Sequence, residues 1–121
     1  MRKHIGFWAA FGAMAASSCS NSSGPDLSAH VEANILGFVT IKNNDKFDWK
    51  DCQIALNAHR FSGGYSASEP LVRHGKEIVL YAAQFADDDG TRFDPGRQLV
   101  KAITIECDTP LGRGNYSGSR N

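Results

Sequence analysis

The chain has 121 residues, with 13 lysine and arginine side chains against 13 aspartate and glutamate side chains, so its formal net charge is zero. A chain of this length builds one domain around one hydrophobic core. The balanced charge lacks the basic excess with which proteins bind phosphate backbones, which argues against nucleic-acid binding.

The first eighteen residues have the layout of a bacterial export signal. Basic residues at positions 2 and 3 precede a run of apolar and small residues from Ile5 to Ala16. The run is shorter than the roughly 20 residues of a membrane-spanning helix, but it fits the apolar region of a signal peptide, which needs roughly 7–15. We therefore predict that residues 1–18 form a helical signal peptide that directs the chain out of the cytoplasm.

Residues 16–19 resemble the lipobox of bacterial lipoproteins in their two serines and final cysteine, but depart at Ala16, where that family usually carries a large aliphatic residue. The resemblance implies that Cys19 carries lipid, that the membrane is a partner and, because Ser20 follows, that the membrane is the outer one. Residues 19–29 are then the lipid-attachment cysteine and a flexible tether, since positions 20–25 are small and polar. Alternatively, signal peptidase I releases the chain after a small-x-small site.

Residues 30–121 show short β-strand patterns between turn clusters and no sustained helical period. Strands are expected at 35–42 with a bulge near Gly37, at 52–57, in a short edge segment around Tyr65 within an otherwise looped 59–69, at 77–81, at 100–107 and in a short segment ending at Tyr116. Because residues 77–81 are apolar on both faces, we expect that strand at the centre of a sheet. The prediction is an all-β domain, a single small immunoglobulin-like antiparallel β-sandwich of six or seven strands, with a small barrel as the alternative.

Two cysteines remain once Cys19 is assigned to lipid. Cys52 and Cys107 each occupy the inward phase of an alternating strand, so both thiols can face one core. In an exported protein a disulfide between them would persist, and closing this loop would stabilise the fold by about 4 kcal/mol. The alternatives are two buried free thiols, or Cys52 as a nucleophile, against which its inward phase argues.

Three blocks of sequence, at residues 43–49, 85–93 and 108–114, are similar to a pattern found in small bacterial exported proteins. The first block reads Asn-Asn-Asp-Lys-Phe-Asp-Trp, and the second contains Asp-Asp-Asp-Gly-Thr-Arg between two phenylalanines. The resemblance implies an immunoglobulin-like sandwich. It brings no activity, catalytic residue or ligand with it.

The acidic run Asp87–Asp89, followed by Gly90, is the most suggestive candidate for chemistry. Clustered carboxylates on a turn can bind Ca²⁺, which takes 6–8 oxygen ligands. The EF-hand pattern fails, because Phe85 stands where that pattern begins with an aspartate. The alternative is a solvated acidic turn in which one aspartate accepts backbone N–H groups and Arg92 supplies the counter-charge.

The remaining candidate residues are more typical of surface or core positions. His30, His59 and His74 lie far apart on loops or strand ends, and no known catalytic motif surrounds them. Five aromatic residues could form a face that binds a sugar or a protein, although a small domain also needs them for its core. They are Phe47, Trp49, Tyr65, Phe85 and Phe93.

These observations predict an exported, lipid-anchored protein of the bacterial cell envelope, facing the periplasm or the cell surface from the outer membrane, or else a periplasmic or secreted one. Its domain is expected to be a non-catalytic interaction or structural module whose partner is an envelope protein or a glycan. The sequence offers no catalytic residues, metal site or cofactor. The alternatives are a small envelope hydrolase and a calcium-stabilised spacer that uses the Asp87–Asp89 loop.

Overall fold

The structure is a computed structural model that describes residues 24–58 and 64–119, and the expected signal peptide and Cys19 lie outside these ranges. The described residues form seven strands and one short 3₁₀ turn. In chain order these are β1 (Ala29–Ala33), β2 (Phe38–Asn43), β3 (Trp49–Leu56), β4 (Tyr65–Val72), β5 (Glu77–Tyr81), η1 (Ala82–Gln84), β6 (Ala102–Thr109) and β7 (Gly112–Ser119). Among the residues described, no helix has the length and apolar character to span a membrane.

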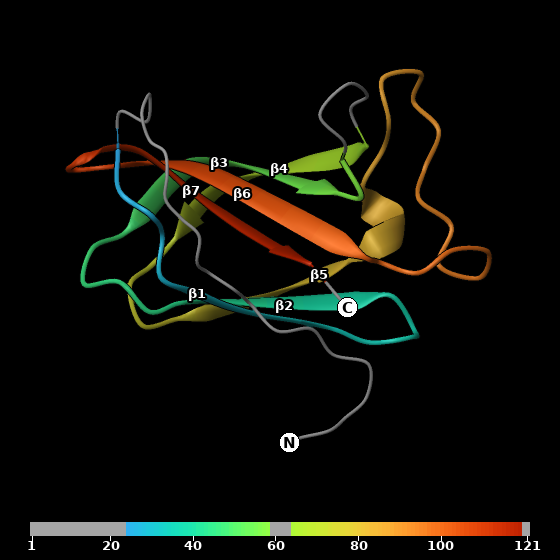
Figure 1. Cartoon of the computed structure of the whole chain (residues 1–121), viewed down its shortest axis with the longest axis horizontal. Helices are drawn as coiled ribbons and strands as arrows, with labels where there is room; N and C mark the ends of the chain where they lie inside the picture. Colours follow the sequence, from blue (N-terminus) through green and yellow to red (C-terminus); the bar gives the residue numbers. More distant parts are fainter. Residues whose placement is uncertain (1–23, 59–63, 120–121) are drawn as a thin grey trace.

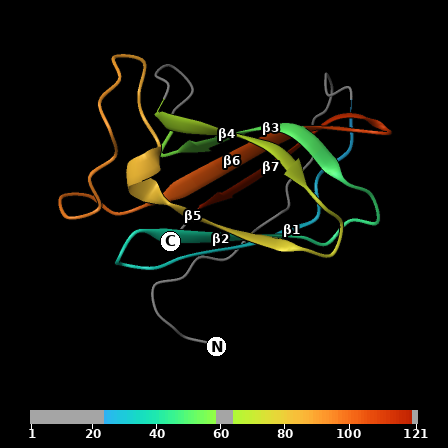
Figure 2. The same ribbon diagram turned by 180° about the vertical axis from the view of Figure 1, so that it is seen from behind.

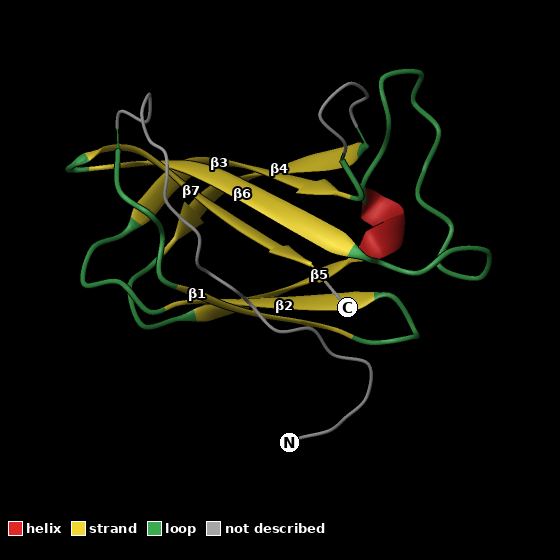
Figure 3. Ribbon diagram, viewed as in Figure 1, coloured by secondary structure: helices red, strands yellow, loops and turns green. Residues whose placement is uncertain are grey.

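The strands form two antiparallel sheets that face each other across one core (Figure 1). One sheet has the order β1-β2-β5 and the other the order β4-β3-β6-β7. Strands occupy most of the described chain, as Figure 3 shows, with loops at both ends of the sandwich. The predicted immunoglobulin-like sandwich is therefore confirmed, and the alternative of a closed barrel is wrong. In antibody constant domains the fourth strand joins the sheet of the first, whereas here β4 pairs with β3.

Alternating side chains from both sheets fill the core, as the sequence pattern predicted for β3 and β6. The inward residues of these two strands are all buried: Cys52, Ile54, Leu56, Ile103, Ile105 and Cys107. The largest fully buried side chains are those of Trp49, Phe85 and Phe93.

The first predicted strand, at residues 35–42, begins too early, because the strand in the structure is β2 (Phe38–Asn43). The structure has a hairpin here, with β1 and β2 joined by a turn whose tip carries Ile35 and Leu36. The Asn34 side chain makes this turn, because its Oδ1 accepts the backbone N–H groups of Leu36 and Phe38 at 3.0 and 3.1 Å. Gly37 is the last turn residue, with φ of 94°, and is not a bulge within a strand.

The segment expected as a loop with a short edge strand around Tyr65 forms an eight-residue strand, β4. Its small polar residues give no hydrophobic alternation, and Pro70 argues against an interior strand. β4 lies at the margin of its sheet, which is where a proline is tolerated.

Residues 77–81, which we expected at the centre of a sheet, form the edge strand β5. Among the described residues β5 pairs on one side only, with β2, so that prediction is wrong.

The Gly-rich tail forms a full strand, β7, with Tyr116 inside it and not at its end. Gly114 is needed here for space, because a Cβ at this position would lie 2.6 Å from Leu27. Leu27 is itself buried, so the folded domain includes residues that the sequence assigned to the tether. Burial also raises the pKa of the Tyr116 hydroxyl to about 12.

Candidate functional site

Cys52 and Cys107 form a disulfide, as predicted, with their Cα atoms 4.1 Å apart. The bridge joins neighbouring strands of one sheet, whereas the bridge of antibody domains joins the two sheets. A β-bulge in β3 makes this possible, because Asp51 adopts a left-handed conformation with φ of 49° and brings Cys52 opposite Cys107. Both sulfurs are bonded and buried, so Cys52 does not act as a nucleophile.

The block at residues 43–49 serves the fold. The fully buried Asn43 carboxamide donates to the carbonyls of Phe47 and Val72, both at 3.0 Å, and accepts the Asp45 N–H at 2.8 Å. Asp45 Oδ2 in turn accepts the Trp49 indole N–H at 3.0 Å. These bonds satisfy the buried polar groups of the turn between β2 and β3, so the block's polar residues are explained by structure.

The acidic loop is a turn organised by one aspartate. Asp87 Oδ1 accepts the backbone N–H groups of Asp89 and Thr91, both at 2.9 Å. Arg92 does not supply the expected counter-charge, because its guanidinium donates to the carbonyl of Ala83 at 3.2 Å. In the described ranges, no three histidine, cysteine or acidic side chains converge as metal ligands. The geometry therefore favours the solvated acidic turn over a calcium site.

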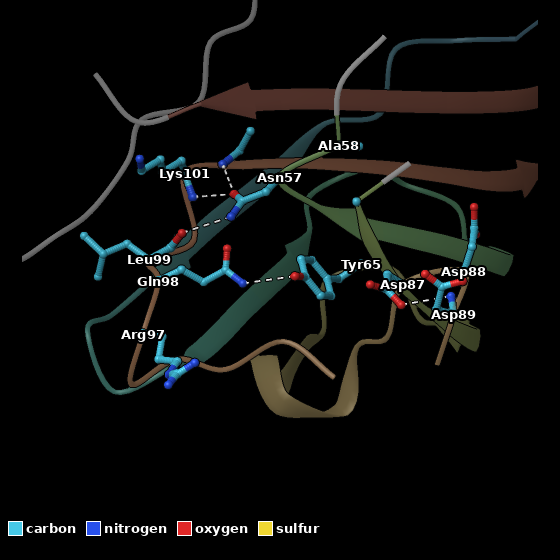
Figure 4. A pocket seen from close by; sticks show the side chains of 12 residues that line it. Asn57, Ala58, Tyr65, Asp87, Asp88, Asp89, Arg97, Gln98, Leu99 and Lys101 are labelled. Carbon is cyan, nitrogen blue, oxygen red and sulfur yellow. Dashed lines mark hydrogen bonds between the residues drawn. The ribbon is translucent and has the colours of Figure 1, made fainter. Parts of the chain in front are cut away.

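A shallow groove of about 890 Å³ lies beside this loop, between the ends of β3, β4 and β6 (Figure 4). Its Asn57 side chain accepts the N–H groups of Lys101 and Ala102 and donates to the Leu99 carbonyl. The Tyr65 hydroxyl accepts from the Gln98 amide at 3.2 Å. These groups hold the neighbouring backbone and loop, and no nucleophile and base meet in the described part of the groove.

The two histidines within the described residues, His30 and His74, do not come together. His30 contacts Glu32, with Nε2 2.9 Å from Oε2, but both side chains are more than half exposed on the outer face of β1 and away from the groove. His74 lies exposed in the turn before β5, and His59 is outside the described residues. A histidine and a carboxylate on an open face lack the concave surroundings that a catalytic pair requires.

The five aromatic residues belong to the core or its rim. Trp49, Phe85 and Phe93 are fully buried, and Tyr65 packs edge-on against Phe93 with ring centroids 5.2 Å apart. Phe47 is partly buried against the same core. The proposed sugar-binding face therefore does not form from this set.

An exposed apolar patch lies elsewhere, on the outer face of the three-stranded sheet. Phe38 and Tyr81 are register partners on β2 and β5, with ring centroids 5.1 Å apart, and they are 44% and 39% exposed. Val79 is 61% exposed, and Ile35 and Leu36 on the adjoining turn are each 65% exposed. We call these five residues the outer patch. Sequence reasoning missed it, because it treated β5 as buried on both faces.

A contiguous exposed apolar patch marks an interaction surface, whereas an ordinary solvent-facing sheet surface is polar. The other exposed large apolar residues, Leu71, Leu99 and Leu111, come from separate elements.

Comparison of the chain with protein-family models, curated protein sequences and solved structures finds no match to any of the three. Its function must therefore be argued from its own residues.

Proposed function

We propose that this protein is exported, is held at the bacterial cell envelope through lipid on Cys19, and uses its sandwich as a non-catalytic interaction module. The observation that carries the proposal is the outer patch, because it places aromatic and aliphatic side chains in solvent on one regular sheet face. The signal pattern of residues 1–18 and the resemblance to exported proteins support the location.

The disulfide is in keeping with this location, because disulfides persist in oxidising compartments and are rare in the cytosol. The tether fits the same picture. A small, polar stretch after Cys19 would separate a lipid from a domain that includes the buried Leu27. The partner would be another envelope component.

The anchor is tested by labelling cells with a clickable fatty acid and measuring the mass of the mature N-terminus. We expect label in the wild-type chain, a terminus at Cys19, and no label in the Cys19→Ser variant. An unlabelled wild-type chain, or a terminus at another residue, would reject the lipid anchor and leave a released periplasmic or secreted protein.

The interaction role is tested with a photo-crosslinking amino acid at Phe38 in the full chain, with the same probe at Ser117 as control. Ser117 is also exposed, but it lies on β7 in the other sheet. We expect discrete cross-linked products from position 38 and none from position 117. Equal products at both positions, or none at either, would contradict a specific interaction surface.

A further inference from the structure

The two sheets have four margins, formed by β1, β5, β4 and β7. Edge strands present unpaired N–H and C=O groups, and proteins usually cover or interrupt them. β7 is covered at its centre, because Leu27 N donates to the Asn115 carbonyl at 2.9 Å and Asn115 N donates to the Pro25 carbonyl at 3.1 Å. β1 turns the polar side chains of His30 and Glu32 outward.

β4 is interrupted at two places along its open side. Ser66 exchanges two backbone hydrogen bonds with Ala86, at 2.8 and 3.1 Å, on the side away from β3. Pro70 lies four residues further on, so it faces the same side, and it has no N–H to offer. Only Ser68 is left between them with its backbone groups on the open side.

β5 has less protection, because only its last residue, Tyr81, has its N–H covered. Ala82 N donates to the Gly37 carbonyl and Asn43 N donates to the Lys76 carbonyl, so alternate residues from 76 to 82 direct their backbone groups to β2. The residues between them, Glu77, Val79 and Tyr81, therefore direct theirs to the open margin, where Gln84 Oε1 accepts the Tyr81 N–H at 2.9 Å. Within the described chain, no other strand pairs with this margin. Figure 2, which views the molecule from behind, shows β5 at the edge of its sheet.

The side chains of β5 leave apolar surface uncovered on both faces of this margin. Val79 and Tyr81 of the outer patch point outward. Ile78 and Leu80 point to the core but remain only partly buried, whereas Val39 and Ile41 on the neighbouring β2 are 0% exposed. A strand added beside β5 would pair its backbone and cover apolar side chains on both faces.

We propose that this added strand is β5 of a second copy of the chain, antiparallel and centred on Val79. Two three-stranded sheets would become one six-stranded sheet, and the two outer patches would form one continuous surface. The inference rests on the interaction role proposed above and names the partner. It does not depend on the lipid anchor.

The sequence of β5 favours itself as a partner because its two ends are complementary. Centring the pair on Val79 places Glu77 opposite Tyr81 of the second copy, so a carboxylate meets a phenol that can donate a hydrogen bond to it. The like charges of the two Glu77 side chains stay apart, at opposite ends of the pair. This register also places each of the five residues opposite a residue of the second copy, and the Gln84 side chain must release the Tyr81 N–H for the backbone of that residue to pair.

Two five-residue strands bury less surface than the roughly 1,200 Å² of a standard stable interface. The dimer should therefore be weak, and cross-linking is the best way to detect it. We would express the full chain with two different tags, one form carrying Glu77→Cys and the other Tyr81→Cys. A short bis-maleimide cross-linker is then added to the mixture. Side chains directly opposite lie within roughly 5.5 Å, whereas Glu77→Cys alone would place its thiols about 13 Å apart.

We expect at least tenfold more cross-linked dimer from the mixed pair than from either variant alone, and a dimer from Val79→Cys. Ser68→Cys, at the open position of β4, is the matched control and should give none. Labelling with a monofunctional maleimide confirms that each thiol is accessible. Equal cross-linking of Glu77→Cys alone and of the mixed pair would overturn the register. No dimer from accessible thiols would overturn the second copy as partner.

A second comparison separates pairing from folding. Val79→Lys added to the mixed pair should abolish the cross-link with an unchanged melting temperature, whereas Thr40→Lys, one strand further in on the same face, should keep it. Loss with both variants would contradict edge pairing. If the Phe38 probe captures another protein while Val79→Cys gives no dimer, the interaction role stands and the second copy is wrong.

Discussion

β4 and β5 are consecutive strands joined by the turn at residues 73–76, and each forms the margin of a different sheet. β4 has two serines and an alanine in its first half and carries Pro70, and a loop residue, Ala86, covers part of its open side. β5 has one charged residue, no proline, and apolar side chains on both faces. The margins at β4 and β5 are thus protected to different degrees, and the less protected one, at β5, adjoins the outer patch.

The two sheets also differ in what they contribute, one to stability and the other to interaction. The disulfide and the bulge that accommodates it lie in the sheet of β4, while the exposed aromatic pair lies in the sheet of β5. One sheet contains the disulfide, and its edge strand β4 is partly covered by Ala86. The other sheet presents both apolar surface and the open edge of β5. Changes on the two sides should therefore have different consequences.

The largest expected effect comes from removing the bridge. Cys52→Ala together with Cys107→Ala should lower the free energy of unfolding by about 4 kcal/mol, because the unfolded chain regains the entropy of an open loop. Denaturant titration measures this, and hydrogen exchange should show the loss of protection centred on β3 and β6. A double variant as stable as the wild type would mean that the four-stranded sheet does not depend on its bridge.

The next effect concerns Asn43, which ties the two edge strands together. Its side chain donates to Val72 at the end of β4, and its backbone pairs with Lys76 and Gly75 before β5. Asn43→Ala leaves buried carbonyls without a donor and should cost about 2–3 kcal/mol by thermal or chemical unfolding.

Asn44→Ala is the matched control for this substitution, because Asn44 is exposed and makes its contact through the backbone. It should change stability by less than about 0.5 kcal/mol. Equal effects at the two positions would show that the carboxamide of Asn43 does not stabilise the connection between β4 and β5.

Hydrophobic alternation predicted the strands whose side chains alternate between the core and solvent, β3 and β6. The inward phase of Cys52 and Cys107 follows from a period of two, and the disulfide then follows from the shared core. The pattern could not show whether a strand has one neighbour or two. Residues 77–81 are apolar on both faces, and this is true of a central strand and of an edge that another chain covers.

Two strands that the sequence predicted only in part, β4 and β7, carry few large apolar residues. β4 begins Tyr-Ser-Ala-Ser-Glu and β7 is rich in glycine, so both carry only a weak hydrophobic signal. Their positions depend on long-range pairing with β3 and β6. For the candidate sites, the sequence suggested that one aspartate of the acidic loop bonds backbone N–H groups, and Asp87 does so. Arg92 could not be placed, because its partner is a backbone carbonyl nine residues away.

The margin at β7 gives a smaller, pH-dependent effect. The pKa of Tyr116 is about 12 in the folded chain and 10.0 for an ordinary tyrosine, so the unfolded chain loses this proton first as pH rises. Stability should be full below pH 10, fall between pH 10 and 12, and then level off. The loss should be about 1–2 kcal/mol, since one pKa unit corresponds to about 1.4 kcal/mol and the side chain retains some contact with solvent.

Chemical denaturation across this pH range measures the Tyr116 effect, and difference absorbance follows the phenol itself. Tyr116→Phe cannot ionise, so its stability should lack this part of the alkaline fall. The same slope in both proteins would assign the fall to other groups.

The smallest effect tests whether Pro70 protects β4. Pro70→Val should lower the free energy of unfolding by less than about 1 kcal/mol, because proline restricts the unfolded chain and its replacement restores that freedom. The substitution also gives β4 an N–H on its open side, between Ser68 and the end of the strand. We expect Ser68→Cys, which gives no cross-linked dimer in the wild-type background, to give one when combined with Pro70→Val. If it still gives none, the cover of Ser66 by Ala86 is sufficient to protect this margin, and the contrast with β5 depends on that loop and not on the proline.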